Sequence, residues 1–205
     1  PAFTMHPQSQ VWPQGHAASF TVAATGNGTL SYQWRKDGAA LSGATGTTFA
    51  IPSALPGDTG NYDCVVTSTL NATTTSAASS AAVLTVLAPP GITSFTATRN
   101  TITSGTATTL TAVFSSGTGV IDHGIGTVTS GVPVSTGRLN SDTTFTLTVS
   151  NQAWASATAQ TTVSVIAAPS ITSFSPARIT LTPGKATTLT AVFSGGVGSV
   201  DRGIG

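Results

Sequence analysis

A repeat of 79 residues constrains the fold of this chain more than any other feature. The segment that begins Pro90-Gly91-Ile92-Thr93-Ser94-Phe95 returns as Pro169-Ser170-Ile171-Thr172-Ser173-Phe174, and the alignment runs without a gap to Gly126 and Gly205. Of the 37 aligned positions, 24 are identical. A duplication this close predicts a domain that is used more than once, so we expect an array of similar units.

Alternation of apolar residues and threonine predicts β-strands inside the repeat. A period of two is typical of a strand with one buried face. Turn residues recur at roughly 10-residue spacing, as in a β-sandwich. The inward positions are expected to be Leu110, Ala112 and Phe114, then Phe145, Leu147 and Val149, then Thr161, Val163 and Val165.

Composition supports an all-β fold and argues against nucleic acid and membranes as partners. Only 6% of the 205 residues are charged, and the acids are all aspartate. Threonine and valine suit pleated surfaces, whereas glutamate and lysine support helices. The net charge is +1 and the basic residues are scattered, so no basic patch for nucleic acid is expected. No apolar run of about 18 residues exists, which argues against membrane insertion.

Short proline-containing linkers predict the domain boundaries. Ala88-Pro89-Pro90-Gly91 and Ala167-Ala168-Pro169-Ser170 favour extended backbone. We therefore expect domains at 1–88, 89–167 and 168–205. The third is the N-terminal part of a second copy of 89–167, about 40 residues short of a full repeat. We expect a piece of a longer array; the alternative is that another chain donates the missing strands.

The first 88 residues contain a different set of strands and turns. A strand over Ser19–Ala24 would bury Phe20 and Val22, and a strand over Leu30–Arg35 would bury Trp34. Lys36-Asp37-Gly38 is expected to be a turn, because its Asp-Gly pair suits a tight hairpin. Further strands are expected over 47–51, over 62–66 and within 73–87, with a turn at 56–58.

Two motifs of this region resemble a known family. Tyr32-Gln33-Trp34-Arg35-Lys36-Asp37-Gly38, followed by Asp58-Thr59-Gly60-Asn61-Tyr62-Asp63-Cys64, is similar to an I-set immunoglobulin-like domain of bacterial secreted and cell-surface proteins. The resemblance covers most of residues 4–87, and residues 89–167 resemble a second kind of bacterial immunoglobulin-like repeat. The resemblance implies tandem immunoglobulin-like β-sandwiches, of which the third is truncated.

The resemblance also implies a structural core. Trp34 is expected at the centre and Tyr62 at a tyrosine corner. The family places a second cysteine where this chain has Val22, and Cys64 is the only cysteine, so the family's disulfide cannot form. Val22, Trp34 and Cys64 are instead expected to pack as an apolar cluster, with Cys64 an inert, buried thiol.

The titratable residues predict no metal, cofactor or catalytic site. His6, His16 and His123 have no zinc-type spacing, and Arg202 replaces His123 in the copy, so all three are expected to be loop residues. Asp122 and Asp201 share the motif Asp-X-Gly-Ile-Gly, which favours an Asx-type turn; a shared calcium ligand is the alternative. Lys36 and Lys185 lie near turns, which argues against an isopeptide crosslink.

Candidate sites for carbohydrate are few. Asn27-Gly28-Thr29 and Asn71-Ala72-Thr73 fit the N-glycosylation sequon, and the Thr/Ser faces could carry O-linked sugars. Trp12 and Trp154 are candidates for stacking on a glycan, although lone tryptophans more often serve packing. Trp154 is expected on a turn between the last two strands of its domain.

These observations predict a non-enzymatic, extracellular or cell-surface protein. An enzyme would need converging acid, base or nucleophile groups, which the sequence does not display. We expect a structural or adhesive stalk, adhesin or filament that associates with itself or with neighbouring subunits. The alternative is a carbohydrate-targeting or spacer module of a larger secreted enzyme, with a glycan as partner.

Overall fold

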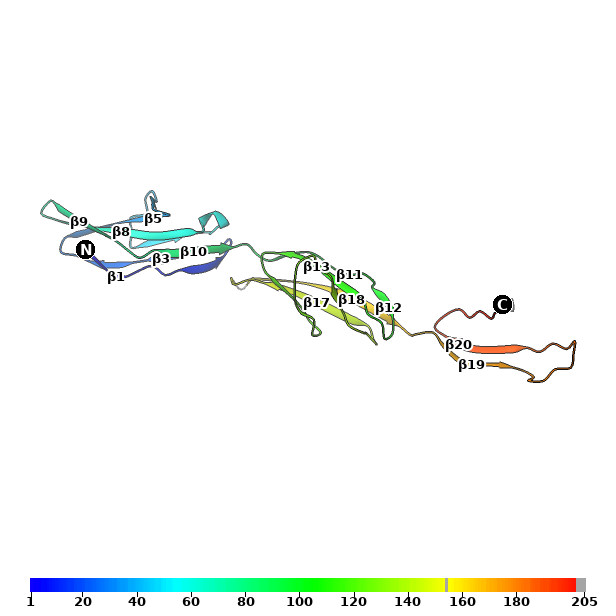
Figure 1. Ribbon diagram of the computed structural model, residues 1–205. Helices are drawn as coiled ribbons and strands as arrows, with labels where there is room; N and C mark the ends of the chain where they lie inside the picture. Colours follow the sequence, from blue (N-terminus) through cyan, green and yellow to red (C-terminus); the bar gives the residue numbers. More distant parts are fainter. Residues whose placement is uncertain (154, 202–205) are drawn as a thin grey trace. The chain divides into compact units, whose positions relative to one another are not determined.

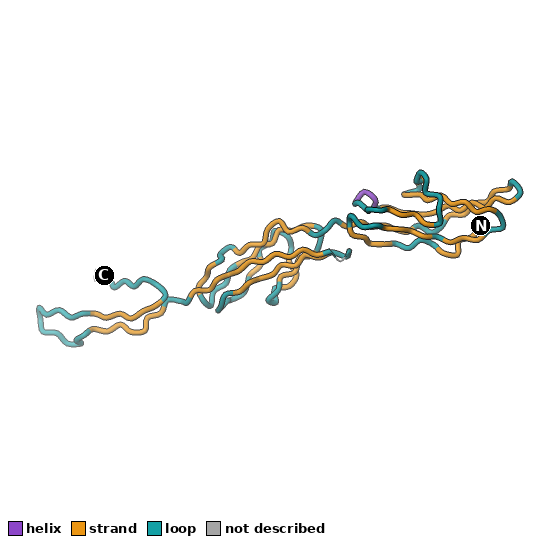
Figure 2. Tube along the Cα trace, turned by 180° about the vertical axis from the view of Figure 1, so that it is seen from behind, coloured by secondary structure: helices purple, strands orange, loops and turns teal. Residues whose placement is uncertain are grey.

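The computed structural model describes residues 1–153 and 155–201, and the described chain is made of β-strands, turns and loops (Figure 2). The helical segment drawn there is the 3-10 turn η1 (Pro56–Asp58). The all-β prediction is therefore confirmed. The chain forms two compact units, one of residues 1–93, 114–119 and 148–158 and one of the rest. The three-domain division stays a prediction, and each set of sheets is described by itself.

The first set of strands contains one large sheet. It is antiparallel except that β10 (Ala82–Leu87) runs parallel to β2 (Gln10–Pro13). Strand β8 (Gly60–Leu70) also pairs with β9 (Thr73–Ala78) (Figure 1). Long cross-strand pairing fixes its register, with Trp34 opposite Cys64. The strand order is β2 (Gln10–Pro13), β10 (Ala82–Leu87), β8 (Gly60–Leu70), β5 (Thr29–Lys36) and β6 (Ala39–Ala40).

The opposite layer consists of two short antiparallel pairs. They are β1 (Ala2–Met5) with β4 (Ala23–Thr25), and β3 (Ala18–Thr21) with β7 (Thr48–Ile51). The single strand expected over 19–24 is wrong, because the chain changes partner at Val22. The Val22 amide donates to the carbonyl of Thr47 at 2.9 Å, which ends one pairing before the next begins.

The last strand expected within 73–87 is β10, and the same stretch also contains a second strand, β9, that was not expected. Ser79 separates the two strands: its hydroxyl accepts the Cys64 amide at 3.0 Å, and its own amide donates to the Cys64 carbonyl at 2.8 Å. The next amide, that of Ser80, donates to Nδ1 of His6 at 3.0 Å. Side chains therefore satisfy backbone groups where the ladder is broken.

The Asp37-Gly38 hairpin prediction is confirmed, with a small correction. Both residues have positive φ, 49° and 83°, as a tight two-residue hairpin turn between β5 and β6 requires. Lys36 was expected in the turn but is the last residue of β5, paired with Ala39 and with Tyr62.

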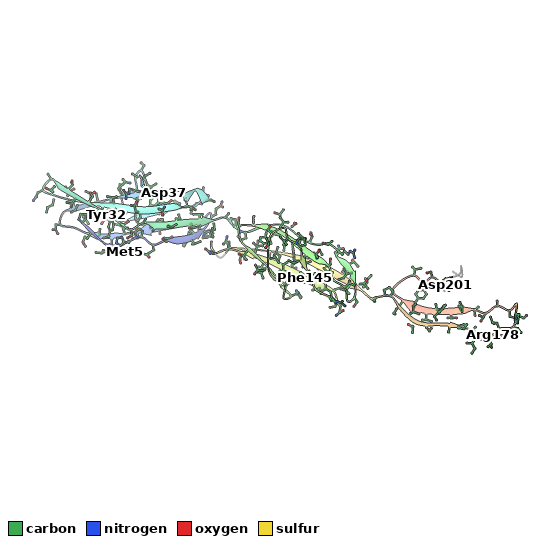
Figure 3. The ribbon with its side chains drawn as sticks, viewed as in Figure 1. Met5, Tyr32, Asp37, Phe145, Arg178 and Asp201 are labelled. Carbon is green, nitrogen blue, oxygen red and sulfur yellow. The ribbon has the colours of Figure 1, made fainter. Side chains whose placement is uncertain are left out.

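The second set of strands forms two facing layers. One contains β11 (Gly91–Ala97), β13 (Thr109–Ser115) and β16 (Val134–Ser135). The other contains β12 (Thr101–Thr103), β18 (Ser156–Ile166), β17 (Thr143–Ser150), β14 (Thr118–Ile121) and β15 (Gly126–Val128). Figure 3 labels Phe145 among these strands. The predicted alternation is confirmed, since the buried side chains include Leu110, Ala112, Phe145, Leu147, Val149 and Val163.

The aligned second copy contributes one described hairpin. Its strands are β19 (Ser170–Pro176) and β20 (Leu189–Ser194), paired antiparallel with Ser170 opposite Ser194. Every residue of both strands is exposed. The hairpin therefore has the register of a sandwich layer with its inner face open.

Candidate functional site

The core of the first sandwich is organised around Trp34. This side chain is fully buried, and its indole nitrogen donates to the carbonyl of Gly46 at 2.9 Å. Val22, Tyr62 and Cys64 lie in the same buried cluster, each at most 2% exposed. Phe20 stacks on Tyr62 with ring centroids 4.9 Å apart. The four residues predicted for the core are thus brought together by β5, β8 and the junction of β3 with β4.

Tyr62 forms a corner with the turn that precedes its strand. Its hydroxyl donates to the carbonyl oxygen of Asp58 at 2.7 Å, four residues upstream. Thr59, beside that turn, accepts the Val86 amide at 3.0 Å. Burial, and the nearby charges of Asp58 and Asp37, raise the pKa of Tyr62 to about 12. The phenol therefore serves as a neutral donor.

Cys64 shows the environment of a packing residue. The side chain is fully buried, and burial raises the pKa of its thiol, while the hydrogen bond with the backbone of Gln33 acts in the opposite direction. A nucleophilic cysteine needs the reverse, a thiolate favoured by a base or a cationic setting. The thiol of Cys64 therefore acts as a small apolar side chain in the core.

Five of the six aspartates are occupied by hydrogen bonds or an ion pair within the fold. Asp63 forms a two-pronged ion pair with Arg35, which raises the pKa of the guanidinium through the hydrogen bond. Four other aspartates accept backbone amides in or beside turns. These pairs are Asp37 with Asn61 (2.9 Å), Asp58 with Leu55 (2.8 Å), Asp122 with Thr146 (2.9 Å) and Asp142 with Val165 (2.6 Å).

Asp122 differs from the Asx-type turn that its motif suggests. Its Oδ1 accepts an amide from the neighbouring strand β17 and lies 2.8 Å from Nδ1 of His123. Burial acts to raise the pKa of Asp122, but the hydrogen bonds of Thr146 and His123 lower it on balance. The carboxylate therefore fastens β17 to the turn after β14, which is a cross-strand role.

The histidines lie in exposed segments, as expected of loop residues, but each has a defined contact; Nδ1 of His16 lies 3.4 Å from the carbonyl oxygen of Gln14. His6 accepts the Ser80 amide and packs beside Phe3, with ring centroids 5.5 Å apart. His123 sits edge-on to Phe145 at 5.2 Å. Within residues 1–153 and 155–201, no group of three or more His, Cys, Asp or Glu could hold a metal ion.

Trp12 is committed to packing. Its indole nitrogen donates to the carbonyl of Ala17 at 2.6 Å, and the half-buried ring packs against the core cluster. Such a ring offers little free face for a sugar. Trp154, the other stacking candidate, lies outside the described residues.

Lys36, which was considered for an isopeptide crosslink, directs its Nζ to the carbonyl of Gly57 at 2.5 Å.

Asn27 and Asn71 lie beside one shallow polar hollow of about 390 Å³ at the β8–β9 turn. Both asparagines are exposed. Asn71 and Ala72 form the turn with positive φ of 49° and 67°. Glycosylation at these two residues stays a prediction.

Threonine hydroxyls pair with one another across neighbouring strands. These pairs lie on the outer faces of the sheets. The hydroxyl oxygens are 3.2 Å apart in Thr21 and Thr48, 2.7 Å in Thr98 and Thr109, and 2.8 Å in Thr144 and Thr162. Sequence reasoning predicted threonine-covered faces but not this pairing, which depends on register. The surface they make is polar and uncharged.

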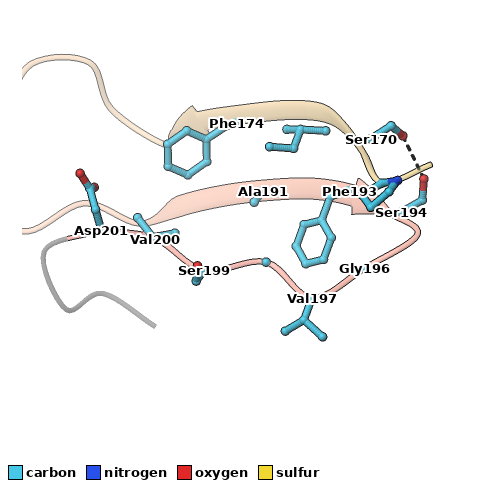
Figure 4. A pocket seen from close by; sticks show the side chains of 13 residues that line it. Ser170, Phe174, Ala191, Phe193, Ser194, Gly196, Val197, Ser199, Val200 and Asp201 are labelled. Atoms are coloured by element: carbon cyan, nitrogen blue, oxygen red, sulfur yellow. Dashed lines mark hydrogen bonds between the residues drawn. The ribbon is translucent and has the colours of Figure 1, made fainter. Parts of the chain in front are cut away.

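Another hollow lies on the open face of the β19–β20 hairpin. Its volume is about 710 Å³, and Phe174, Phe193 and Ala191 line it together with segment 196–201 (Figure 4). Across the described residues, no helix has the length and apolar character needed to cross a bilayer.

Comparison with known proteins supports the fold. A five-domain immunoglobulin fragment of Sidekick-1 superimposes with a TM-score of 0.63 at 18% identity, covering 85% of this chain and 40% of that one. A titin fragment, domains I67–I69 in an E-to-A variant, gives 0.61 at 18% identity, covering 85% and 68%. At this level of identity the likeness concerns the fold.

One curated protein shares sequence with the chain. The decoration protein of Escherichia phage T5 is 40% identical over 55 residues, which are 26% of this chain and 34% of that protein. The match thus spans about a third of the length of that relative. Residues 1–68 match the family described as immunoglobulin domain. The chain therefore carries an immunoglobulin-like domain, followed by repeats of immunoglobulin-like β-sandwich fold.

Proposed function

We propose that this protein is a non-enzymatic structural or adhesive component of an extracellular surface. Its tandem immunoglobulin-like domains would form a stalk, adhesin or filament. The observation that carries the proposal is the 79-residue repeat, which reproduces one sandwich layer at β11–β13 and again at β19–β20. Over residues 1–153 and 155–201, no group of three or more His, Cys, Asp or Glu converges. Repetition of such a module suits reach and association rather than chemistry.

The use of the polar residues supports this proposal. Five aspartates are bonded to backbone amides or to Arg35, and the thiol of Cys64 is buried. Acid–base chemistry would need such groups free to meet a substrate. The uncharged threonine faces also give little repulsion between neighbouring copies, which favours association with the same or similar subunits.

The relative in phage T5 supports placement on a surface. That protein is a decoration protein, and the shared segment is 40% identical over 55 residues. We propose that this chain is likewise displayed on a surface, either of a cell or of a particle. The alternative role, a carbohydrate-targeting module, receives no support from Trp12, because its indole is bonded to Ala17.

Labelling of intact source material tests the proposal. Antibodies raised against residues 1–88 should decorate unbroken cells or particles in electron microscopy, with no increase after permeabilisation. Labelling that appears only after permeabilisation would contradict surface display. A glycan array with the purified chain tests the alternative: we expect no bound sugar.

A further inference from the structure

The large sheet of the first sandwich has one long edge that no described strand covers. Strand β9 pairs with β8 on one side, and among the described strands nothing pairs with its other side (Figure 1). The next strand on the same edge, β10, is covered by β2. Five of the six residues of β9 are exposed. An edge of this kind is a template for pairing with a further strand.

The cover of this edge ends at a defined residue. Nδ1 of His6 accepts the amide of Ser80 at 3.0 Å, and the hydroxyl of Ser9 accepts the amide of Val83 at 2.9 Å. Strand β2 then pairs with residues 84–87. The chain therefore satisfies outward amides from Ser80 onward, and β9 lies just before that point.

The pairing of β9 with β8 determines which backbone groups point outward. The Ser79 amide donates to the Cys64 carbonyl at 2.8 Å, directly after the end of β9. Bonded and non-bonded pairs alternate along an antiparallel ladder, so residues 73, 75 and 77 also bond to β8. The N–H and C=O groups of Thr74, Ser76 and Ala78 therefore face away from the sheet.

Strand β9 lacks the features that prevent edges from pairing. Natural sheets protect an edge with very short strands, with proline or with charged side chains. The outer strand β6 has only two residues, and β2 ends at Pro13. Strand β9 has six residues, none of them proline or charged. Its sequence therefore leaves the edge competent to pair.

The neutral surroundings of the edge favour a second copy of β9 as the partner strand. The Ser76 hydroxyl lies 2.8 Å from the hydroxyl of Thr67, which holds this side chain on the sheet face. Arg35 and Asp63, on the same face, neutralise each other. A charged strand would find no opposite charge here, whereas a second β9 brings small, neutral side chains and no repulsion.

We propose that β9 is an edge-pairing site for a second copy of this chain, with the two β9 strands antiparallel about a two-fold axis at Ser76. Ser76 lies opposite its own copy and Thr74 lies opposite Ala78, and each such pair exchanges two backbone hydrogen bonds. The two large sheets become one sheet across the contact. This inference rests on the proposed function and deepens it, because it names a contact through which copies at a surface associate. The contact is short, so it gains strength when many copies are held side by side.

Disulfide trapping in the 205-residue protein tests the register. In Ser76→Cys the two thiols meet at the axis, where facing Cα atoms lie about 5.5 Å apart, within the range of a disulfide. Thr75→Cys is the matched control, since this exposed side chain lies on the other sheet face and its Cα would face residue 77. Cys64 is buried in both variants.

We expect Ser76→Cys to form a covalent dimer about tenfold faster than Thr75→Cys, because only residue 76 meets its own copy. The rate should rise with protein concentration. Equal rates in the two variants would overturn the proposal.

Lysine pairs locate the contact. Thr74→Lys with Ala78→Lys, added to Ser76→Cys, would place like charges opposite each other across the axis and should slow covalent dimer formation about tenfold. Thr29→Lys with Ser31→Lys is the control, because it adds the same charge to β5, two strands inward from the edge. This control should dimerise at the rate of Ser76→Cys. If both lysine pairs slow the reaction equally, the contact is not at β9.

Amide exchange and sedimentation identify the occupant. In the Ser76→Cys dimer the amides of Thr74 and Ala78 should exchange about tenfold more slowly than after reduction. A dimer without this protection would overturn the proposal. So would an unlinked protein that protects these amides while it sediments as a monomer, because a segment of the same chain would then cover the edge. Surface labelling of intact material does not depend on β9, so failure here is distinguishable from failure of the proposed function.

Discussion

The hydroxyl of Tyr62 donates to the carbonyl oxygen of Asp58 at 2.7 Å, which ties strand β8 to the 3-10 turn that leads into it. The phenol ring also stacks with Phe20 and lies 5.9 Å from the ring of Phe49. One residue thus joins the turn, the large sheet and the opposite layer.

Loss of this hydroxyl should destabilise the first sandwich without changing its packing. Tyr62→Phe removes one hydrogen bond and leaves the part-buried carbonyl of Asp58 short of its donor, so the free energy of unfolding should fall by about 1–2 kcal/mol. Urea unfolding followed by Trp34 fluorescence measures the change. Tyr32→Phe, at a half-buried position of β5, is the matched control. An equal loss in both variants would contradict a special role for Tyr62.

Alkaline pH should weaken the same sandwich. The pKa of Tyr62 is raised to about 12, whereas a tyrosine in the unfolded chain titrates near 10. Because the folded pKa is the higher one, this contribution to stability is fully present below pH 10 and is lost as pH rises through 12. Melting temperatures measured from pH 8 to 12 should decline above pH 10. The decline should be smaller in Tyr62→Phe, and an equal slope would contradict the assignment.

Restoring a second cysteine should restore the inter-sheet bridge. Val22 and Cys64 lie in one buried cluster from opposite layers, so Val22→Cys should form a disulfide with Cys64 under oxidising conditions. A native-like bridge stabilises by about 2–4 kcal/mol. Mass spectrometry before and after reduction detects it. Val66→Cys, also buried on β8, is the control and should remain reduced. A folded Val22→Cys protein with two free thiols would refute the placement of residue 22 opposite Cys64.

The β8–β9 turn should gain stability from a glycine. Ala72 has a φ of 67°, a left-handed conformation that is unfavourable for alanine. Ala72→Gly should therefore raise the free energy of unfolding by about 0.5–1 kcal/mol, after the entropy of the more flexible unfolded chain is subtracted. Gly38→Ala, at a φ of 83°, should produce a change of opposite sign. Thermal melts of both variants check the pair.

The strands could be predicted from the sequence because alternation is a local property. Phe145, Leu147 and Val149 read as inward positions and are fully or almost fully buried. What the sequence did not reveal depends on contacts between distant residues. The partner of Asp122 lies 24 residues away, and the change of pairing at Val22 depends on Thr47.

The separate strand β9 was not predicted, for the same reason. Ser79 lies in a run of small residues in which no local signal marks the end of a strand. The end of β9 is stabilised from elsewhere, by the Ser79 hydroxyl on the Cys64 amide and by His6 on the Ser80 amide. His6 is 74 residues from Ser80, and no local motif signals the pairing.

The threonine pairs have a consequence for the conditions this protein can tolerate. The cross-strand bond between Thr144 and Thr162 links two neutral hydroxyls, as does the bond between Thr98 and Thr109. Neither partner titrates near neutral pH, and dissolved ions screen charges rather than hydroxyl pairs. Outer faces joined in this way keep the same cohesion in dilute water, in brine and across a wide pH range. That property fits the proposed placement of this protein on an extracellular surface.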